Sequence, residues 1–121
     1  MRRAVDLVAR LQARQPTDRS LGQHFLIDET HLNAIASMAG DLQGRTVLEI
    51  GPGPGTLTEH LLRAGAMVHA IEIDAVAVDH LRTTFAEEIE EQRLVLTEGD
   101  ALGATWPNTI DAVVSNIPYQ I

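Results

Sequence analysis

The chain has 121 residues and a formal net charge of −8, with nine Arg, no Lys and seventeen acidic residues. It has no Cys, which excludes disulfides and thiolate metal sites, and no apolar run approaches the roughly 18 residues of a membrane span. We expect one cytoplasmic domain without a signal peptide, whose acidic body disfavours tight non-specific binding to nucleic acid.

The N-terminal segment is the basic part of the chain. Residues 1–26 hold five Arg and two acids, whereas the remainder holds four Arg and fifteen acids. The spacing predicts a helix over residues 3–14, with an apolar face and a charged face. Two interpretations stay open: an accessory helix with a solvated charged face, or an arm that contacts RNA through Arg10 and Arg14. Under the second interpretation the RNA affinity of the whole segment rests on Arg2, Arg3, Arg10, Arg14 and Arg19.

The next segment, Gly22–Leu26, reads by itself as a loop, and an isolated His24 is more often structural than functional. The stretch over residues 46–58 is far more informative. Thr46–Ile50 is a predicted buried strand, a glycine–proline loop follows, and an amphipathic helix begins at Thr56. This arrangement is the first half of a βαβ unit. The loop glycines are Gly51, Gly53 and Gly55.

The spacing of these glycines indicates the class of ligand. Glycines let a ligand approach the backbone closely, and the helix N-terminus offers free N–H groups and partial positive charge. The dinucleotide fingerprint is G-x-G-x-x-G, whereas here the glycines recur at every second position after Glu49. The pattern E-x-G-x-G-x-G resembles the cofactor loop of S-adenosylmethionine-dependent methyltransferases. A tight turn without a ligand is the alternative interpretation.

The second strand is predicted over residues 68–74, buried except for its acidic end. Glu72 follows Gly53 by nineteen residues, a position from which a carboxylate can accept hydrogen bonds from both ribose hydroxyls of an adenosine cofactor. Asp74 is expected to cap the next helix. The acidic run over residues 87–91 is expected to continue that helix as solvated surface.

The third and fourth strands are predicted over residues 93–98 and 110–115. Asp100, at the tip of the third strand, can accept from the exocyclic amine of adenine or form a turn. Right-handed crossovers give the strand order 3-2-1-4, and ligands bind where the order reverses, between strands 1 and 4. This prediction brings the segment after residue 115 to the glycine loop.

That segment, Asn116–Tyr119, reads Asn-Ile-Pro-Tyr. If the Asn116 side chain and a following backbone carbonyl accept from an aromatic amine, the nitrogen lone pair turns toward an incoming methyl group. Pro118 rigidifies the turn, and Tyr119 can stack on a base. Methyl transfer from a sulfonium needs little acid–base help, so positioning by these residues would supply most of the rate.

Together these motifs resemble the KsgA-type ribosomal RNA adenine dimethyltransferases, in sequence order and over nearly the whole chain from Ser20. The matching motifs are Gly22–Leu26, Glu49–Gly55, Ile71–Asp74, Gly99–Ala101 and Asn116–Tyr119. The resemblance implies contacts to the methionine end of S-adenosylmethionine from His24, Leu26 and Gly51, to the ribose from Glu72, and to the adenine from Asp100 and Ala101. It places Asn116 near the transferred methyl, and it adds Gly53, Gly55 and Ile73 to the cofactor site and Tyr119 to the RNA contacts.

The resemblance also implies the fold and the function. The expected fold is α/β, a Rossmann-like methyltransferase fold truncated to about four parallel strands with flanking helices. By the resemblance, residues 20–121 would form the N-terminal half of a methyltransferase domain that lacks its C-terminal half and helical RNA-binding domain. Residues 1–19, which precede the matching part, are expected from their charge to form a basic arm. The parent enzyme would methylate adenines near the 3′ end of small-subunit rRNA, and this fragment would be inactive.

Two alternatives remain from the sequence. One is a non-catalytic rRNA-binding assembly or transcription factor on the same fold, and the other is an adenine methyltransferase acting on DNA. The sequence also predicts a homodimer without membrane association, because the fourth strand would expose an unpaired apolar edge. Pairing of that strand, or exchange of the N-terminal helix, would form the dimer.

Overall fold

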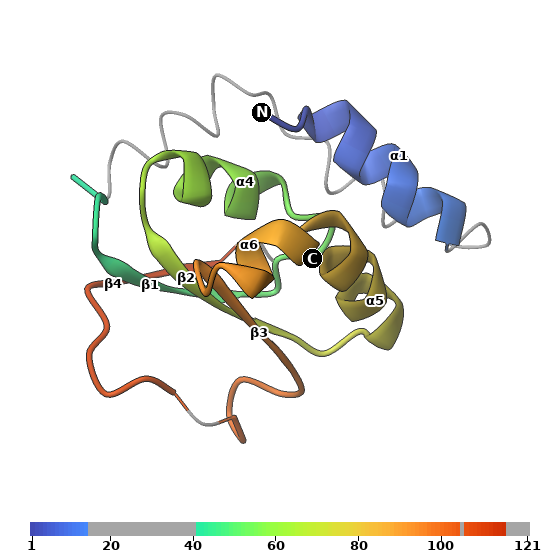
Figure 1. The fold of residues 1–121 in the computed structure, drawn as a ribbon. Helices are drawn as coiled ribbons and strands as arrows, with labels where there is room; N and C mark the ends of the chain where they lie inside the picture. Colours follow the sequence, from blue (N-terminus) through green and yellow to red (C-terminus); the bar gives the residue numbers. More distant parts are fainter. Residues whose placement is uncertain (15–40, 105, 116–121) are drawn as a thin grey trace.

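The structure is a computed structural model that describes residues 1–14, 41–104 and 106–115 (Figure 1). After the first helix, helices separate the first three strands of the chain, which is the pattern of an α/β fold. The elements, with the labels of Figure 1, are α1 (Ala4–Arg14), β1 (Thr46–Ile50), α4 (Thr56–Arg63), β2 (Met67–Glu72), α5 (Ala75–Thr84), α6 (Ala86–Glu90), β3 (Leu94–Glu98) and β4 (Ala112–Ser115).

The strands form one parallel sheet in the order β3-β2-β1-β4. β1 pairs with β2 from Thr46 opposite Met67 to Ile50 opposite Ile71, and it pairs with β4 up to Ile50 opposite Ser115. The order confirms the predicted 3-2-1-4 topology. Because all four strands are parallel, their carboxyl ends lie along one edge of the sheet, and the chain leaves β1 and β4 side by side at that edge.

The helices cover the sheet as the sequence pattern requires. α4 turns Leu57, Leu61 and Leu62 toward the core. Asp74 caps α5 as predicted, since its side-chain oxygen accepts from the Val76 amide at 3.0 Å. α1 lies against α4 and α5 and buries its apolar face, so the described part of the N-terminal segment is packed onto the domain (Figure 1). The buried residues of α1 are Ala4, Leu7, Val8 and Leu11.

Two expectations about acidic residues were wrong. Phe85 is fully buried and separates α5 from α6, so the acidic run does not simply continue α5. Glu88 within that run is buried, because its carboxylate is held by two hydrogen bonds from Arg2. Glu72, expected at an exposed end of its strand, is also buried.

β4 lies at an edge of the sheet, paired with β1 among the described strands. Its residues alternate between half-buried and exposed, and the side chain of Val113 is 57% exposed. The homodimer stays a prediction. No helix within the described ranges is long and apolar enough to cross a membrane.

Candidate functional site

Polar groups from three parts of the chain meet at the carboxyl edge of the sheet. The glycine loop follows β1, Glu72 ends β2, and Gly99 and Asp100 follow β3. The Gly51 amide donates to the Ile71 carbonyl at 2.9 Å, and the Gly99 amide donates to the Glu72 carbonyl at 2.9 Å. These bonds tie the loops after β1 and β3 to β2, which makes the edge one structural unit.

The glycines of the loop are required by its backbone and its packing. Gly53 and Gly55 have φ angles of 55° and 93°, in the left-handed region that side chains disfavour. A Cβ atom at position 55 would lie 2.6 Å from the Phe85 ring. Gly55 therefore serves two purposes: it starts α4, and it lets the loop rest directly on the core beneath it.

Glu72 joins the glycine loop to the start of α5. One carboxylate oxygen accepts from the Gly53 amide at 2.9 Å, and the other accepts from the Asp74 amide at 3.0 Å. An ionised carboxylate offers about four lone-pair positions, so two remain after these bonds. The second strand thereby positions an acceptor group directly against the glycine loop.

Glu49 is a second buried acid near the glycine loop. It is completely buried within β1, and Thr58 of α4 donates its hydroxyl to Oε1. Oε2 has no hydrogen-bond partner in the described part of the chain. Burial raises the pKa of Glu49 to about 7, against the lowering effect of Thr58, and the nearby charge of Glu72 raises it further. The pair of carboxyl groups makes this region strongly favourable to positive charge.

His80 of α5 supports the loop from below. Its Nε2–H donates to the Pro54 carbonyl at 2.8 Å, an assignment that makes Nδ1 the acceptor nitrogen, with the Thr84 hydroxyl 3.5 Å away. Burial lowers the pKa of His80 in spite of the bond to Pro54, and Arg14 and Arg10 lower it further. A neutral imidazole thus anchors the middle of the glycine loop.

The end of β3 carries exposed apolar groups beside polar ones. Asp100 forms a turn, because its Oδ1 accepts from the Leu102 amide at 3.0 Å. The indole of Trp106 donates to the Ala101 carbonyl at 2.9 Å. Leu102, after β3, and Ile73, after the neighbouring β2, are 95% and 71% exposed, so this edge of the sheet presents apolar surface to solvent.

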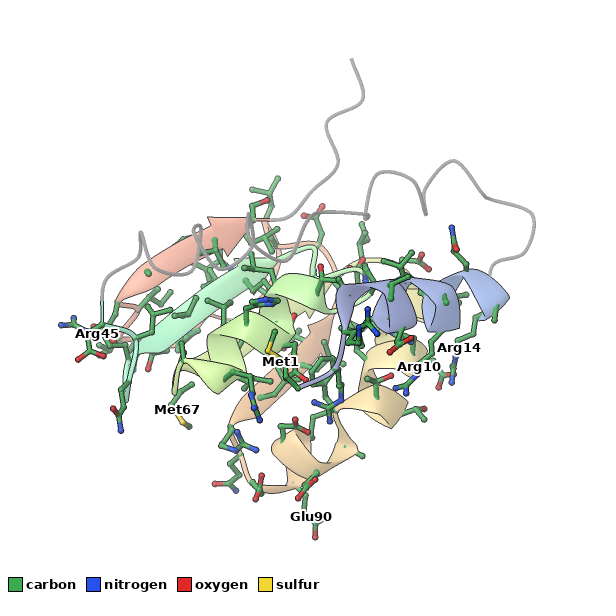
Figure 2. The ribbon with its side chains drawn as sticks, turned by 90° about the horizontal axis from the view of Figure 1, so that it is seen from above. Met1, Arg10, Arg14, Arg45, Met67 and Glu90 are labelled. Carbon is green, nitrogen blue, oxygen red and sulfur yellow. The ribbon has the colours of Figure 1, made fainter. Side chains whose placement is uncertain are left out.

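The sequence-predicted site residues divide into three groups. Residues at the edge just described are Gly51, Gly53, Gly55, Glu72, Ile73, Asp100 and Ala101. Residues outside the described ranges are His24, Leu26, Asn116, Pro118 and Tyr119. Arg10 and Arg14 lie on α1 (Figure 2), and Arg14 forms an ion pair with Asp79 of α5.

Three residues have contacts that sequence reasoning did not assign. Glu49 was part of the predicted cofactor-loop pattern, and its special environment had a signal, since an acid within an otherwise apolar buried strand is unusual. His80 and Arg2 had none, because their partners Pro54, Glu59 and Glu88 lie 26, 57 and 86 residues away in the chain. Only the packing of α1, α4, α5 and α6 brings these groups together.

Comparison with known proteins identifies the family. The family model described as ribosomal RNA adenine dimethylase matches residues 15–121. A ribosomal RNA small subunit methyltransferase A from Novosphingobium aromaticivorans is 44% identical over 106 residues, which cover 85% of this chain and 38% of that protein. The chain thus spans about two fifths of the length of this curated relative.

Solved structures agree with the sequence match. The 23S rRNA methyltransferase ErmE aligns with a TM-score of 0.67 at 32% identity, over 78% of this chain and 37% of that one. A dimethyladenosine transferase from Plasmodium falciparum aligns with a TM-score of 0.65 at 33% identity, over 78% and 34% of the two chains. The chain belongs to the ribosomal RNA adenine dimethylase family.

Proposed function

We propose that this chain supplies the S-adenosylmethionine-binding part of an enzyme that methylates N6 of adenines near the 3′ end of small-subunit rRNA. The observation that carries the proposal is the contact of Glu72 with both the Gly53 loop and the first turn leading into α5. This contact holds the Glu72 carboxylate beside the glycine loop that begins α4, at the carboxyl edge of the parallel sheet.

The residues present fit the chemistry of this cofactor. The two unused lone-pair positions of the Glu72 carboxylate suit the two ribose hydroxyls. The cofactor carries positive charge on its sulfonium and its ammonium group, and the Glu49–Glu72 pair favours positive charge beside the loop. Gly51 and Gly53 add backbone that a ligand can approach closely.

The adenine end of the cofactor finds a suitable surface after β2 and β3. Ile73 and Leu102 expose apolar area that a flat base would cover, and Asp100 supplies a carboxylate beside them. Asp100 uses one oxygen in its turn, which leaves the other oxygen for the exocyclic amine. The role of Asp100 in the turn and its role in binding are therefore compatible.

The bound cofactor supplies an electrophilic methyl group on its sulfonium. The substrate amine must be held and turned toward that group, and Asn116, Pro118 and Tyr119 are proposed for this task. They directly follow Ser115, which pairs with Ile50 at the end of β1. On the RNA side, we propose that Arg10 and Arg14 contact the phosphate backbone.

Calorimetry with S-adenosylmethionine and its demethylated product tests the cofactor proposal. We expect both to bind, and Glu72→Ala should weaken binding by about 1–3 kcal/mol, the cost of leaving hydroxyl partners unsatisfied. Glu98→Ala is the matched control, because Glu98 pairs with Glu72 across β2 and β3 but is exposed. Absence of binding at high ligand concentration would instead favour a non-catalytic RNA-binding factor on this fold.

A further inference from the structure

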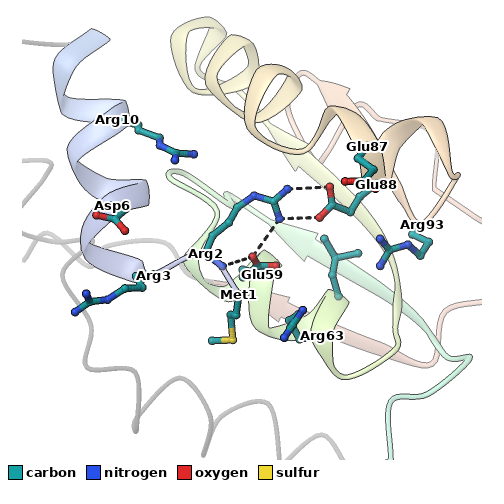
Figure 3. A pocket seen from close by; sticks show the side chains of 11 residues that line it. Met1, Arg2, Arg3, Asp6, Arg10, Glu59, Arg63, Glu87, Glu88 and Arg93 are labelled. Carbon is teal, nitrogen blue, oxygen red and sulfur yellow. Dashed lines mark hydrogen bonds and ion pairs between the residues drawn. The ribbon is translucent and has the colours of Figure 1, made fainter.

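A hollow lies away from the glycine loop, between the start of the chain, α1, α4 and α6. Its volume is about 640 Å³, and Figure 3 shows charged side chains arranged around it. Arg63 ends α4 and Arg93 immediately precedes β3, so this hollow extends toward the amino ends of the strands. Its charged residues are Arg2, Arg3, Asp6, Arg10, Glu59, Arg63, Glu87, Glu88 and Arg93.

The hollow concentrates the positive charge of an acidic chain. Five of the nine Arg residues line it together with four acids, whereas the other four Arg share the rest of the chain with thirteen acids. The lining is therefore net positive and the remainder strongly negative. Such a local reversal of sign attracts anions to one place on the surface.

Two of the four acids are already hydrogen-bonded to Arg2 within the fold. The guanidinium of Arg2 bonds Glu59 at 3.1 Å and bonds the two oxygens of Glu88 at 2.7 and 3.0 Å. The Arg2 backbone amide also donates to Glu59 at 2.6 Å. These acids are buried and committed to Arg2, so they oppose an incoming anion less than free carboxylates would.

Three of the lining arginines, Arg3, Arg10 and Arg63, form no ion pair with any of the described residues, while Arg93 bonds the neighbouring Glu91 at 2.7 Å. In Figure 3, Arg10 reaches into the hollow from α1, and Arg63 stands across from it on α4. Guanidinium groups on separate elements around a hollow of this size suit a chain of phosphates better than one small anion.

We propose that this hollow binds phosphate groups of RNA next to the methylated segment, through Arg10 and Arg63. The proposal rests on the proposed function, which makes RNA the substrate, and it adds to Arg10 a second contact, Arg63, and the hollow between them, which neither the motifs nor the comparisons assign. Arg10 also lines a neighbouring hollow of about 460 Å³ with Arg14 and His80. Arg10 of α1 thus lines both hollows, one beside Arg63 and the other beside His80 of α5, which supports the glycine loop. We expect the RNA strand to run along α1 from the first hollow to the second.

The test measures binding of a fluorescein-labelled RNA hairpin by anisotropy over a range of salt concentrations. Arg10→Gln and Arg63→Gln should each weaken binding by roughly three- to tenfold and reduce the salt slope by about 0.7–0.9, as expected for one lost phosphate contact. Arg82→Gln is the control, because it removes the same charge from an exposed position on α5 that lines neither hollow. It should change the affinity less than twofold.

The outcomes separate the possible explanations. Equal losses in all three variants, or no loss in Arg63→Gln, would overturn the proposal. A titration with inorganic phosphate, followed by NMR on the arginine Nε–H signals, tests whether the hollow is a site for small anions only. Phosphate-dependent shifts of the Arg10 and Arg63 signals, together with unchanged RNA affinity in Arg10→Gln and Arg63→Gln, would also overturn the proposal. Calorimetry with S-adenosylmethionine on the same variants should give wild-type affinity. Failure of the wild type to bind the cofactor, with the Arg63 effect intact, would refute the proposed function alone.

Discussion

Two pairs of buried acids in this domain differ in their partners. Glu59 and Glu88 share the guanidinium of Arg2, which also stacks over the Phe85 ring at 4.5 Å. Glu49 and Glu72 bond backbone amides and one hydroxyl, and among the described residues no cation pairs with either of them. The first pair shares a cation, as in a structural cluster, and the second pair has none among the described residues, as in a binding site.

The protonation behaviour follows the same division. Burial raises the pKa of Glu88, but the bonds and charge of Arg2 outweigh it and hold that pKa below its usual value. Burial of Glu49 is not compensated, and its pKa is raised to about 7. The cluster around Arg2 thus stabilises the fold, whereas ionisation of Glu49 beside the glycine loop lowers stability and favours positive charge there.

The largest effect should come from removing the cation of the structural pair. Arg2→Ala leaves two buried carboxylates without a partner and removes the stacking on Phe85, so we expect a loss of about 3–5 kcal/mol in the free energy of unfolding. Chemical denaturation at neutral pH measures this loss. Arg3→Ala removes the same charge from an exposed neighbour and should cost under about 0.5 kcal/mol. Similar losses in both variants would contradict a specific role for Arg2.

Glu49→Gln should change stability in a pH-dependent way. A carboxyl whose pKa rises from 4.5 to about 7 on folding holds its proton in the folded state while the unfolded chain loses it. Its contribution to stability is therefore present below pH 4.5 and is lost as the pH rises to about 7, by about 3 kcal/mol in total. The variant should match the wild type near pH 4.5 and exceed its stability by roughly that amount at pH 8.

Glu88→Gln is the matched control for this prediction. The pKa of Glu88 is lowered by Arg2, so its ionised form stabilises the folded state above the ordinary carboxyl pKa. Neutralising Glu88 should therefore destabilise the protein at pH 8, opposite in sign to Glu49→Gln. Denaturant unfolding of both variants at pH 4.5 and pH 8 gives the comparison, and destabilisation by Glu49→Gln at pH 8 would show that the two pairs are alike.

The same division explains how much could be predicted from the sequence. The strand–loop–helix of the glycine loop, the position of Glu72 and the cap at Asp74 depend on residues close together in the chain, and local patterns revealed them. The strand order followed from the handedness of crossovers. The Arg2 cluster depends on the start of the chain, before α1, meeting α4 and α6, which no local pattern specifies, so Glu88 was taken for a solvated residue and Arg2 for a cation available to RNA.

His80 joins the two regions and provides the smallest predicted effect. It belongs to the helix layer that packs under α1, yet its Nε2–H bonds the Pro54 carbonyl within the glycine loop. His80→Leu removes the donor and leaves that buried carbonyl unsatisfied, which should cost about 1–2 kcal/mol of stability at pH 7.5. Because burial lowers the pKa of His80, its stabilisation is present above the ordinary histidine pKa of 6.5 and is lost as the pH falls below it, so the cost should shrink at lower pH.

The loop supplies a second readout that distinguishes support of the site from support of the fold alone. If the Pro54 anchor holds the loop in its binding geometry, His80→Leu should also weaken S-adenosylmethionine binding several-fold at a temperature where the variant is fully folded. His69→Leu is the matched control, since it replaces a histidine of β2 that makes no bond to the loop. Calorimetry on both variants decides the matter. Equal cofactor affinity in the His80 and His69 variants would show that His80 contributes to the stability of the fold only. The geometry of the glycine loop would then not depend on its bond to the helix layer.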